Sequence, residues 1–488
     1  MTVAIGDIIE HFKFGPGKVL ELLGTKATID FFGEEICCNV NELKIKKEFA
    51  PKVAVHSKSN NKNKIAFRRG FEAINLGVVP PDSSSLIEMS ISGEKVSGEV
   101  RSNLDNIGSH GLCKVVFGNY GTGKSHYLHL VRSIALQSGW VVSYLEFDPK
   151  AVDPAKPHLV YREIMSKLKF PEREDGTVSQ GFYGLVREIR KNWTIIRDQP
   201  NFKKNPWFRY GLDTLQFYPH NEKREYVSAC NWLAGQAVLL TGAGSIRTLA
   251  RGTKVKPMEI PNMPKVKEVG EIYVFHLVVV NEICKALGYK GLLIILDEAE
   301  HVRGYNVTRK ARANNFFDIL ARSAHLPYGK GYPDLNDHGY DFPKFWDNGP
   351  HFGLYIGLTE GNTFEYEYTS LKDACVFLHD QEDQVTLNSP SRDDYEAWCF
   401  NLLTNFHEYY PEKTGLLFSA DDRKRIAITL ADEFKDNEDS DLVIRIWVKL
   451  ACLVPSVILA RAVKSVDEII TIIQNAVMEL TGGLMPWE

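Results

Sequence analysis

The sequence lacks the patterns that mark several protein classes. Its cysteines are scattered at positions 37, 38, 113, 230, 284, 375, 399 and 452, with no Cys-x-x-Cys or Cys/His spacing. This arrangement argues against a zinc site and against a disulfide framework. The N-terminus has no signal-peptide pattern, and the apolar stretch 444–463 is interrupted by Lys449, Pro455 and Arg461. A packed helix is therefore expected there instead of a membrane span, and the setting is expected to be cytoplasmic, without membrane contact.

The sequence also has no strong charge of one sign. Its formal net charge is -4, with 44% hydrophobic and 25% charged residues in 488 positions. This composition is typical of a globular protein, and the length predicts two to four domains. The small net charge says little about partners, because the charged residues are unevenly distributed along the chain.

One eight-residue segment, residues 118–125, carries most of the chemical information. It fits the pattern G-x-x-x-x-G-K-[ST], which forms the phosphate-binding loop of nucleoside triphosphatases. A short run that reads as a buried strand, 113–117, precedes the segment, and a helix-like apolar period begins at His126. We expect Lys124 to contact the β- and γ-phosphates and Ser125 to hold Mg²⁺. The residues predicted to bind ATP are Gly118, Asn119, Tyr120, Gly121, Thr122, Gly123, Lys124, Ser125 and His126.

A second motif follows a continuous apolar run at 292–296 and consists of Asp297 and Glu298. Carboxylates at the end of a buried parallel strand lie where such sheets bind ligands. We expect Asp297 to reach Mg²⁺ and Glu298 to polarise the attacking water as a general base. A helix that simply begins after a core strand is the alternative, and the presence of the phosphate loop makes this alternative less attractive.

The two motifs are 173 positions apart (297 minus 124), although one βα unit needs only about 30 residues. A helical insertion is therefore predicted at about 157–269. A further strand, 352–358, ends in Thr359 and Glu360. Thr359 is the first candidate and Glu360 the second for positioning water near the γ-phosphate; a plain turn at the strand end is an equal alternative.

The first 50 residues are expected to form a separate small β unit. Short strand-like runs alternate with glycine-containing turns, which suggests an SH3-like barrel. The segment 3–32 resembles the Tudor-like modules that end some bacterial helicases, through Gly6-Asp7, His11, Lys13-Phe14-Gly15, Gly17 and Asp30-Phe31-Phe32. That resemblance implies docking to nucleic acid or to a polymerase-like partner; a structural cap on the ATPase is the alternative.

Residues 51–66 are predicted to be a basic linker between this unit and the rest of the chain. The wider stretch 44–69 holds nine lysine or arginine residues and only one acidic residue, Glu48. A flexible basic arm has salt-sensitive affinity for DNA backbones, whereas a solvated linker without a ligand is an equal alternative.

The remaining layout is predicted to be an α/β P-loop core at 67–380 followed by a helical lid at 381–488. A phosphate loop, an acidic strand, a polar strand end and a helical lid together resemble the AAA+ class. More narrowly, residues 68–80, 118–126, 147–149, 158–162 and 288–300 resemble the ATP-binding proteins of bacteriophage-exclusion (BREX) systems. This likeness implies work within a multi-protein phage-defence system, and the N-terminal β unit is a departure from that family.

The AAA+ resemblance also implies roles for particular arginines. In such assemblies an arginine of a neighbouring subunit completes the ATP site. Arg312 and Arg322 are the candidates for that role, and Arg445 could contact the γ-phosphate from its own subunit. These assignments imply a homo-oligomer.

Two functions remain open on the sequence. The first is an AAA+ ATPase that couples ATP hydrolysis to engagement of DNA within a defence complex. The second is a nucleotide-gated sensor or scaffold that recruits a separate effector, because no nuclease, methyltransferase or deaminase constellation is evident in the chain. A helicase motor is less favoured, since the sequence has no second phosphate loop.

Overall fold

A computed structural model of the protein describes the greater part of the chain. The described residues are 8–11, 15–23, 26–31, 34–39, 43–45, 60–80, 83–105, 107, 111–148, 150–172, 179–216, 224–235, 246–251, 254–256, 261, 269–299, 304–325, 349–359, 384–410, 418–436, 444–460 and 465–481.

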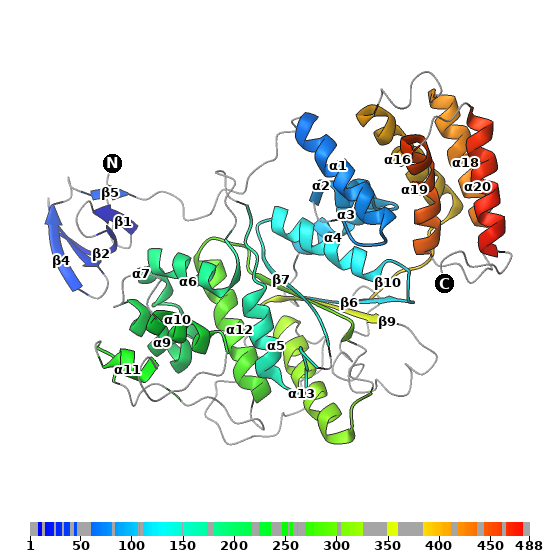
Figure 1. Cartoon of the computed structure of the whole chain (residues 1–488). Coiled ribbons are helices and arrows are strands. Elements are labelled where there is room, and N and C mark those ends of the chain that lie inside the picture. Colours follow the sequence, from blue (N-terminus) through cyan, green and yellow to red (C-terminus); the bar gives the residue numbers. More distant parts are fainter. Residues whose placement is uncertain are drawn as a thin grey trace.

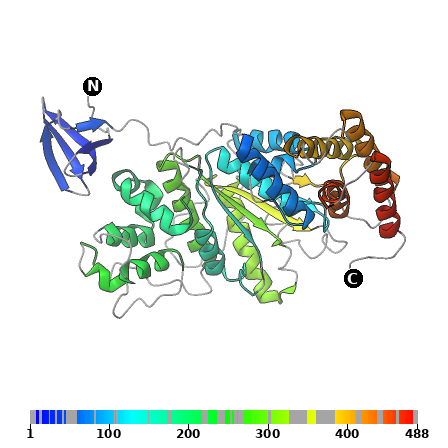
Figure 2. The same ribbon diagram turned by 45° about the horizontal axis from the view of Figure 1, so that its top comes forward.

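The N-terminal unit is a five-stranded antiparallel sheet with the order β4-β3-β2-β1-β5. Its strands are β1 (Ile8–His11), β2 (Gly15–Leu23), β3 (Lys26–Phe31), β4 (Glu34–Asn39) and β5 (Leu43–Ile45). The first four overlap the strand-like runs of the sequence at 8–11, 18–23, 26–31 and 35–38, and β5 was not expected. In Figures 1 and 2 this sheet lies apart from the central sheet. Its closure into an SH3-like barrel stays a prediction.

The central sheet has five parallel strands in the order β10-β6-β9-β8-β7. They are β6 (Leu112–Gly118), β7 (Val141–Glu146), β8 (Leu292–Asp297), β9 (Gly353–Thr359) and β10 (Gln384–Thr386). The four longer strands are largely apolar and buried because helices cover both faces of the sheet. In the register Gly118 pairs with Thr359, and Glu146 pairs with Asp297. These residues therefore lie at the same, carboxyl-terminal edge.

Alternate side chains of each strand enter two different cores. On one face, Val116, Leu293 and Ile295 pack with α3 (Gly93–Asp105) and α4 (Lys124–Gln137). On the other face, Val115 and Ile294 pack with α5 (Pro157–Ser166), α12 (Val269–Ala286) and α13 (Val307–Ala324). Figure 1 shows these two helical layers on either side of the sheet.

Short helices occupy the chain between β7 and α12, the region where the insertion was predicted. After α5 they are α6 (Gly181–Lys191), α7 (Trp193–Ile196), α8 (Pro200–Lys204), α9 (Pro206–Gln216), α10 (Arg224–Leu233) and α11 (Ile246–Ala250). Their buried side chains join the core on the α5 and α12 face of the sheet.

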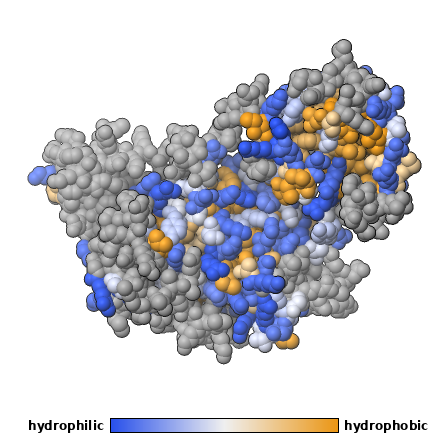
Figure 3. All heavy atoms as spheres, viewed as in Figure 1, coloured by the Kyte–Doolittle hydropathy of each residue, from blue (hydrophilic) through white to orange (hydrophobic). Residues whose placement is uncertain are grey.

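The C-terminal helices form a separate core. They are α16 (Arg392–Tyr409), α18 (Ala420–Asp436), α19 (Ile444–Ala460) and α20 (Val466–Thr481). We call this helical unit, together with α1 (Asn60–Asn75), the lid, because Phe67, Phe71 and Ile74 of α1 are part of its core. Figure 3 shows apolar residues gathered over this part of the molecule. No helix in the described ranges combines the length and the apolar character that crossing a membrane requires.

Two predicted boundaries need correction. Residues 60–66 of the predicted linker are helical, because Phe67 is fully buried in the lid and Lys64 lies over the ring of Tyr410, 4.9 Å from its centroid. The helix α1 therefore starts earlier than expected. Residues 384–386, predicted to be in the lid, form β10 and pair with β6, so the central sheet extends past residue 380.

Candidate functional site

The phosphate loop connects the end of β6 to the start of α4, as the sequence predicted. Gly121 and Gly123 have φ values of 83° and 92°, in the left-handed region that favours glycine. A Cβ on Gly118 would meet the Thr122 hydroxyl at 2.5 Å, and that hydroxyl donates to the carbonyl of Asn119 (2.8 Å). Glycines are thus required for the tight turn that turns backbone amides towards a phosphate.

The side chain of Lys124 extends from the loop to the next strand of the sheet. It is 9% exposed, and its ammonium group donates a hydrogen bond to the hydroxyl of Thr359 at the end of β9. Two of the predicted site residues, 235 positions apart in the chain, are therefore in direct contact. The second candidate at this strand end, Glu360, lies outside the described residues.

Asp297 is fully buried at the end of β8 and has two hydrogen-bond donors. The Tyr144 hydroxyl donates to Oδ2 and the backbone N–H of Glu298 donates to Oδ1, both at 2.9 Å. A Cβ on Gly357 of β9 would lie 2.7 Å from Oδ1 and 2.8 Å from Cδ1 of Leu128 on α4. Glycine at 357 therefore makes room for the carboxylate between β9 and the helix of the phosphate loop.

Glu298 has an unusual backbone conformation. Its φ of 57° places it in the left-handed region, which is uncommon for a residue other than glycine, asparagine or aspartate. Strained conformations of this kind often occur at functional sites, where the surrounding structure holds them. This conformation changes the direction of the backbone immediately after β8, at the residue predicted to be the general base.

Tyr144 and His129 were not among the predicted site residues. The ring of Tyr144 lies 4.3 Å from the ring of His129 on α4, with the guanidinium of Arg132 5.9 Å from the Tyr144 centroid. Burial, followed by the nearby Asp297, raises the pKa of Tyr144, so that the phenol keeps its proton. Burial also lowers the pKa of His129 to about 4, and this histidine is neutral at pH 7. The only sequence signal for Tyr144 was its hydroxyl in a strand-like run near the sheet edge, and Ser143 beside it carries the same signal.

His126 was predicted to bind the nucleotide, and its ring lies against the turn before α3. Its Nε2 is 2.6 Å from the hydroxyl of Ser90, which itself donates to the carbonyl of Leu86. The Ser90 hydroxyl proton is donated to the Leu86 carbonyl, so the hydroxyl oxygen must accept a hydrogen bond from His126. We therefore assign the proton of the His126 ring to Nε2. Burial lowers the pKa of His126 to about 4, which agrees with a neutral ring. This contact anchors the start of α4 to the neighbouring helices.

The three candidate arginines have different surroundings. Arg312 is exposed on α13, where a neighbouring subunit could reach it. Arg322 is 5% exposed and donates to Asp318 at 2.9 Å, so this placement does not fit a residue that acts on a neighbour's nucleotide. Arg445 donates to the carbonyl of Gly77 (2.8 Å) and thereby connects α19 of the lid to the segment after α1.

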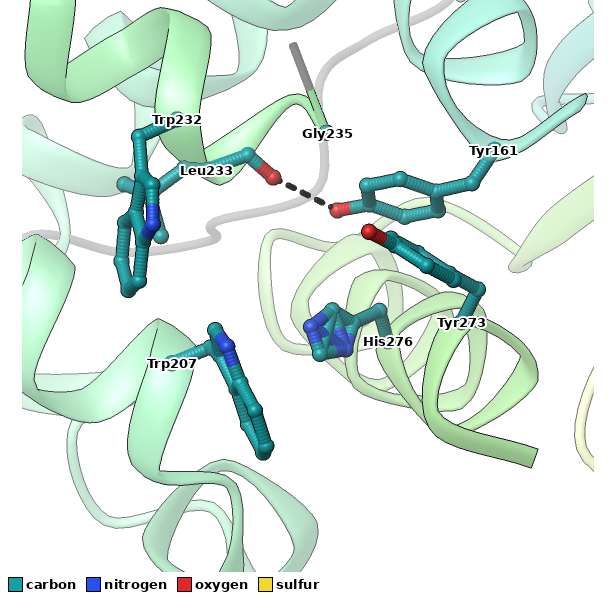
Figure 4. A pocket seen from close by; sticks show the side chains of 7 residues that line it. All are labelled: Tyr161, Trp207, Trp232, Leu233, Gly235, Tyr273 and His276. Carbon is teal, nitrogen blue, oxygen red and sulfur yellow. Dashed lines mark hydrogen bonds between the residues drawn. The ribbon is translucent and has the colours of Figure 1, made fainter. Parts of the chain in front are cut away.

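A separate hollow lies in the insertion, away from these residues. Figure 4 shows that aromatic side chains of α5, α9, α10 and α12 surround it. The Tyr161 hydroxyl donates to the carbonyl of Leu233 (2.8 Å), and the Tyr161 and Tyr273 rings are 5.0 Å apart. These contacts hold the insertion helices to α12, so we interpret the hollow as a packing centre. Its lining residues are Tyr161, Trp207, Trp232, Leu233, Gly235, Tyr273 and His276.

The donor set at the sheet edge fits a nucleotide with magnesium. A hydroxyl (Ser125) and a carboxylate (Asp297) are the hard oxygen ligands that Mg²⁺ prefers. In the described part of the chain no group of three or more His, Cys, Asp or Glu side chains could hold a metal alone. A magnesium ion at this edge would therefore share its coordination with phosphate oxygens and water, as in P-loop sites.

These features define an α/β P-loop nucleoside triphosphatase fold: a parallel sheet, a glycine loop that opens a helix, a buried lysine and an acidic strand end. The model of the family described as BREX system ATP-binding protein BrxC/D matches residues 66–204 and 268–328. The gap between the matched segments falls in the insertion. This match supports the resemblance to the ATP-binding proteins of bacteriophage-exclusion systems.

Other comparisons add little. The solved structure of the Walker-type ATPase paby2304 of Pyrococcus abyssi aligns with 74% of this chain and 71% of its own, at 11% identity. Its TM-score is 0.29, which is too low to support a conclusion on the fold. No curated protein matches the chain.

Proposed function

We propose that this protein is an AAA+ type ATPase that hydrolyses ATP with Mg²⁺ and works in prokaryotic anti-phage defence. The observation that carries the proposal is the contact between Lys124 of the phosphate loop and Thr359 of β9, with Asp297 buried beside β9. These three groups come from distant parts of the chain and meet at one sheet edge. The family match over residues 66–204 and 268–328 supports the defence setting.

In this proposal each group has a defined task. The loop amides and Lys124 bind the phosphates, while Ser125 and Asp297 hold the metal ion. Mg²⁺ would neutralise charge that develops on the phosphate oxygens. Glu298 accepts a proton from the attacking water, and Thr359 helps to orient that water from the end of the neighbouring strand β9.

The substitution Glu298→Gln tests the catalytic assignment. It removes the base but keeps the size and the backbone N–H that donates to Asp297. We expect ATP binding to persist and the steady-state rate of ATP hydrolysis to fall at least about 100-fold, the size of a general-base contribution. Glu94→Gln, on an exposed position of α3, is the matched control and should hydrolyse ATP at the wild-type rate. Normal turnover by Glu298→Gln would show that the assignment is wrong.

The proposed partners are DNA, other defence proteins and further copies of this chain. The basic residues of 44–69 and the N-terminal sheet are the proposed DNA-binding part, and Arg68 and Arg69 are exposed on α1. The exposed Arg312 is the remaining candidate for completing a neighbour's site. Stimulation of ATP hydrolysis by double-stranded DNA, weakened by added salt, would support DNA coupling.

The alternative function is a nucleotide-gated scaffold that recruits a separate effector. The contact of Arg445 with the carbonyl of Gly77 favours it, because a lid fixed to the segment between α1 and α2 (Ser83–Glu88) can respond to bound nucleotide without fast turnover. ATP-dependent assembly measured by light scattering, with no effect of DNA on hydrolysis, would select this alternative.

A further inference from the structure

The hydroxyl of Tyr144 lies between two carboxylates at the end of the sheet. It is 2.9 Å from Oδ2 of Asp297 and 3.4 Å from Oε1 of Glu146. A phenol has one proton, so it can fully satisfy only one of these acceptors at a time. The shorter distance identifies Asp297 as its main partner in this structure.

The ring of Tyr144 contacts α4, the helix that follows the phosphate loop. His129, whose ring is 4.3 Å away, lies on α4, the helix that begins with Lys124 and Ser125. Tyr144 therefore touches the helix that carries one proposed metal ligand and donates to the other proposed ligand. A residue in that position can fix the relative placement of the two.

The second oxygen of Asp297 is also fixed. Oδ1 accepts from the backbone N–H of Glu298, and Gly357 leaves it space beside β9. Two donors of different origin, one side chain and one backbone, thus define the rotation of the Asp297 carboxylate. Removing the side-chain donor would free that rotation without changing the backbone.

We propose that Tyr144 is a positioning residue that orients Asp297 for the metal ion of the nucleotide site; this inference rests on the proposed function. Groups that hydrogen-bond a metal ligand from behind commonly change metal affinity by about 10- to 100-fold when they are removed. Tyr144 does not touch the nucleotide in this proposal, and its effect passes through Asp297.

The test uses Tyr144→Phe in the full chain, with Glu298→Gln present so that ATP is not consumed. Binding of a fluorescent ATP analogue is titrated with Mg²⁺, and Mn²⁺ binding is followed separately by electron paramagnetic resonance. We expect the half-saturating Mg²⁺ and Mn²⁺ concentrations to rise about tenfold. Nucleotide affinity in EDTA should change less than about twofold, because Lys124 and the loop are untouched.

Tyr161→Phe is the matched control, because it deletes one buried hydroxyl that donates to the Leu233 carbonyl, far from the sheet edge. It should leave the metal dependence unchanged. Thermal unfolding of both variants in EDTA checks that they fold. An unchanged or tighter metal dependence in folded Tyr144→Phe overturns the inference. Loss of nucleotide binding in the chain with wild-type Tyr144 would instead overturn the proposed function itself.

Discussion

Gly357 shows how a single hydrogen atom in place of a side chain can shape the site. A Cβ added at this position of β9 would lie 2.7 Å from Oδ1 of Asp297 on one side and 2.8 Å from Leu128 of α4 on the other. We expect Gly357→Ala to push the carboxylate and the helix apart. Overpacking of this kind lowers the free energy of unfolding by about 1–3 kcal/mol, and we also expect weaker binding of Mg²⁺ and ATP.

The matched control for this prediction is Gly98→Ala. Gly98 lies on α3 with no atom within 4 Å of an added Cβ, so alanine should stabilise the helix by about 0.5–1 kcal/mol. Urea unfolding of the two variants should therefore shift in opposite directions. Equal shifts would mean that the space beside Asp297 is larger than this structure shows.

At the residue scale the sequence predicted those groups that belong to a local pattern. Lys124 and Asp297 follow from motifs, and Thr359 follows from its place at a strand end. Tyr144 and Gly357 could not be found in this way, because their importance comes from contacts with Asp297, 153 positions from Tyr144 and on another strand from Gly357. No spacing rule within the chain specifies which strands become neighbours.

At the scale of elements, a buried histidine on α12 makes the stability depend on pH. His276 of α12 is 3% exposed, and burial lowers its pKa to about 3. In the unfolded chain this histidine has a pKa near 6.5. Between pH 6.5 and 3 the imidazole is therefore protonated in the unfolded state and neutral in the folded state. Stability is therefore lost as the pH falls from about 6.5 towards 3, by up to about 1.4 kcal/mol per pH unit for this group.

The substitution His276→Phe should remove the part of the pH dependence of the unfolding free energy that comes from His276. Between pH 6 and 5 we expect the wild type to lose about 1 kcal/mol more free energy of unfolding than the variant, measured by urea unfolding. Tyr273→Phe, on the same helix and in the same aromatic hollow, is the control, because burial raises the pKa of Tyr273 to about 12. It should keep the wild-type pH dependence. The same slope in His276→Phe would contradict the prediction.

The strands and helices differ in how well the sequence predicts them. Long apolar runs such as 292–296 predicted β8 because a strand buried on both faces has no polar alternation. The three-residue strand β10 has exposed ends and was missed, since so short a segment has no period to detect. The start of α1 was missed because Asn60–Lys64 is polar, and only its contact with the lid reveals the helix.

At the scale of the whole molecule, the C-terminal helices pack against α1, a helix from the first part of the chain. The helix α1 precedes the phosphate loop in the sequence, yet its apolar face completes the core of helices α16, α18, α19 and α20. Phe67 is fully buried and its ring lies 5.0 Å from that of Tyr409. The lid is therefore attached to the nucleotide-binding core through two chain segments, one between α1 and α2 and one between β10 and α16.

This arrangement predicts that Phe67→Ala destabilises the lid selectively. A phenylalanine deleted from a packed core costs about 3–5 kcal/mol, and the loss should appear as faster hydrogen exchange in α16, α18 and α20, with the central sheet unchanged. Phe208→Ala, an equally buried site in α9, is the control and should speed exchange in the insertion while the lid keeps its protection. If Phe67→Ala instead loosens the central sheet and leaves α18 and α20 protected, α1 belongs energetically to the ATPase core and the lid folds without it.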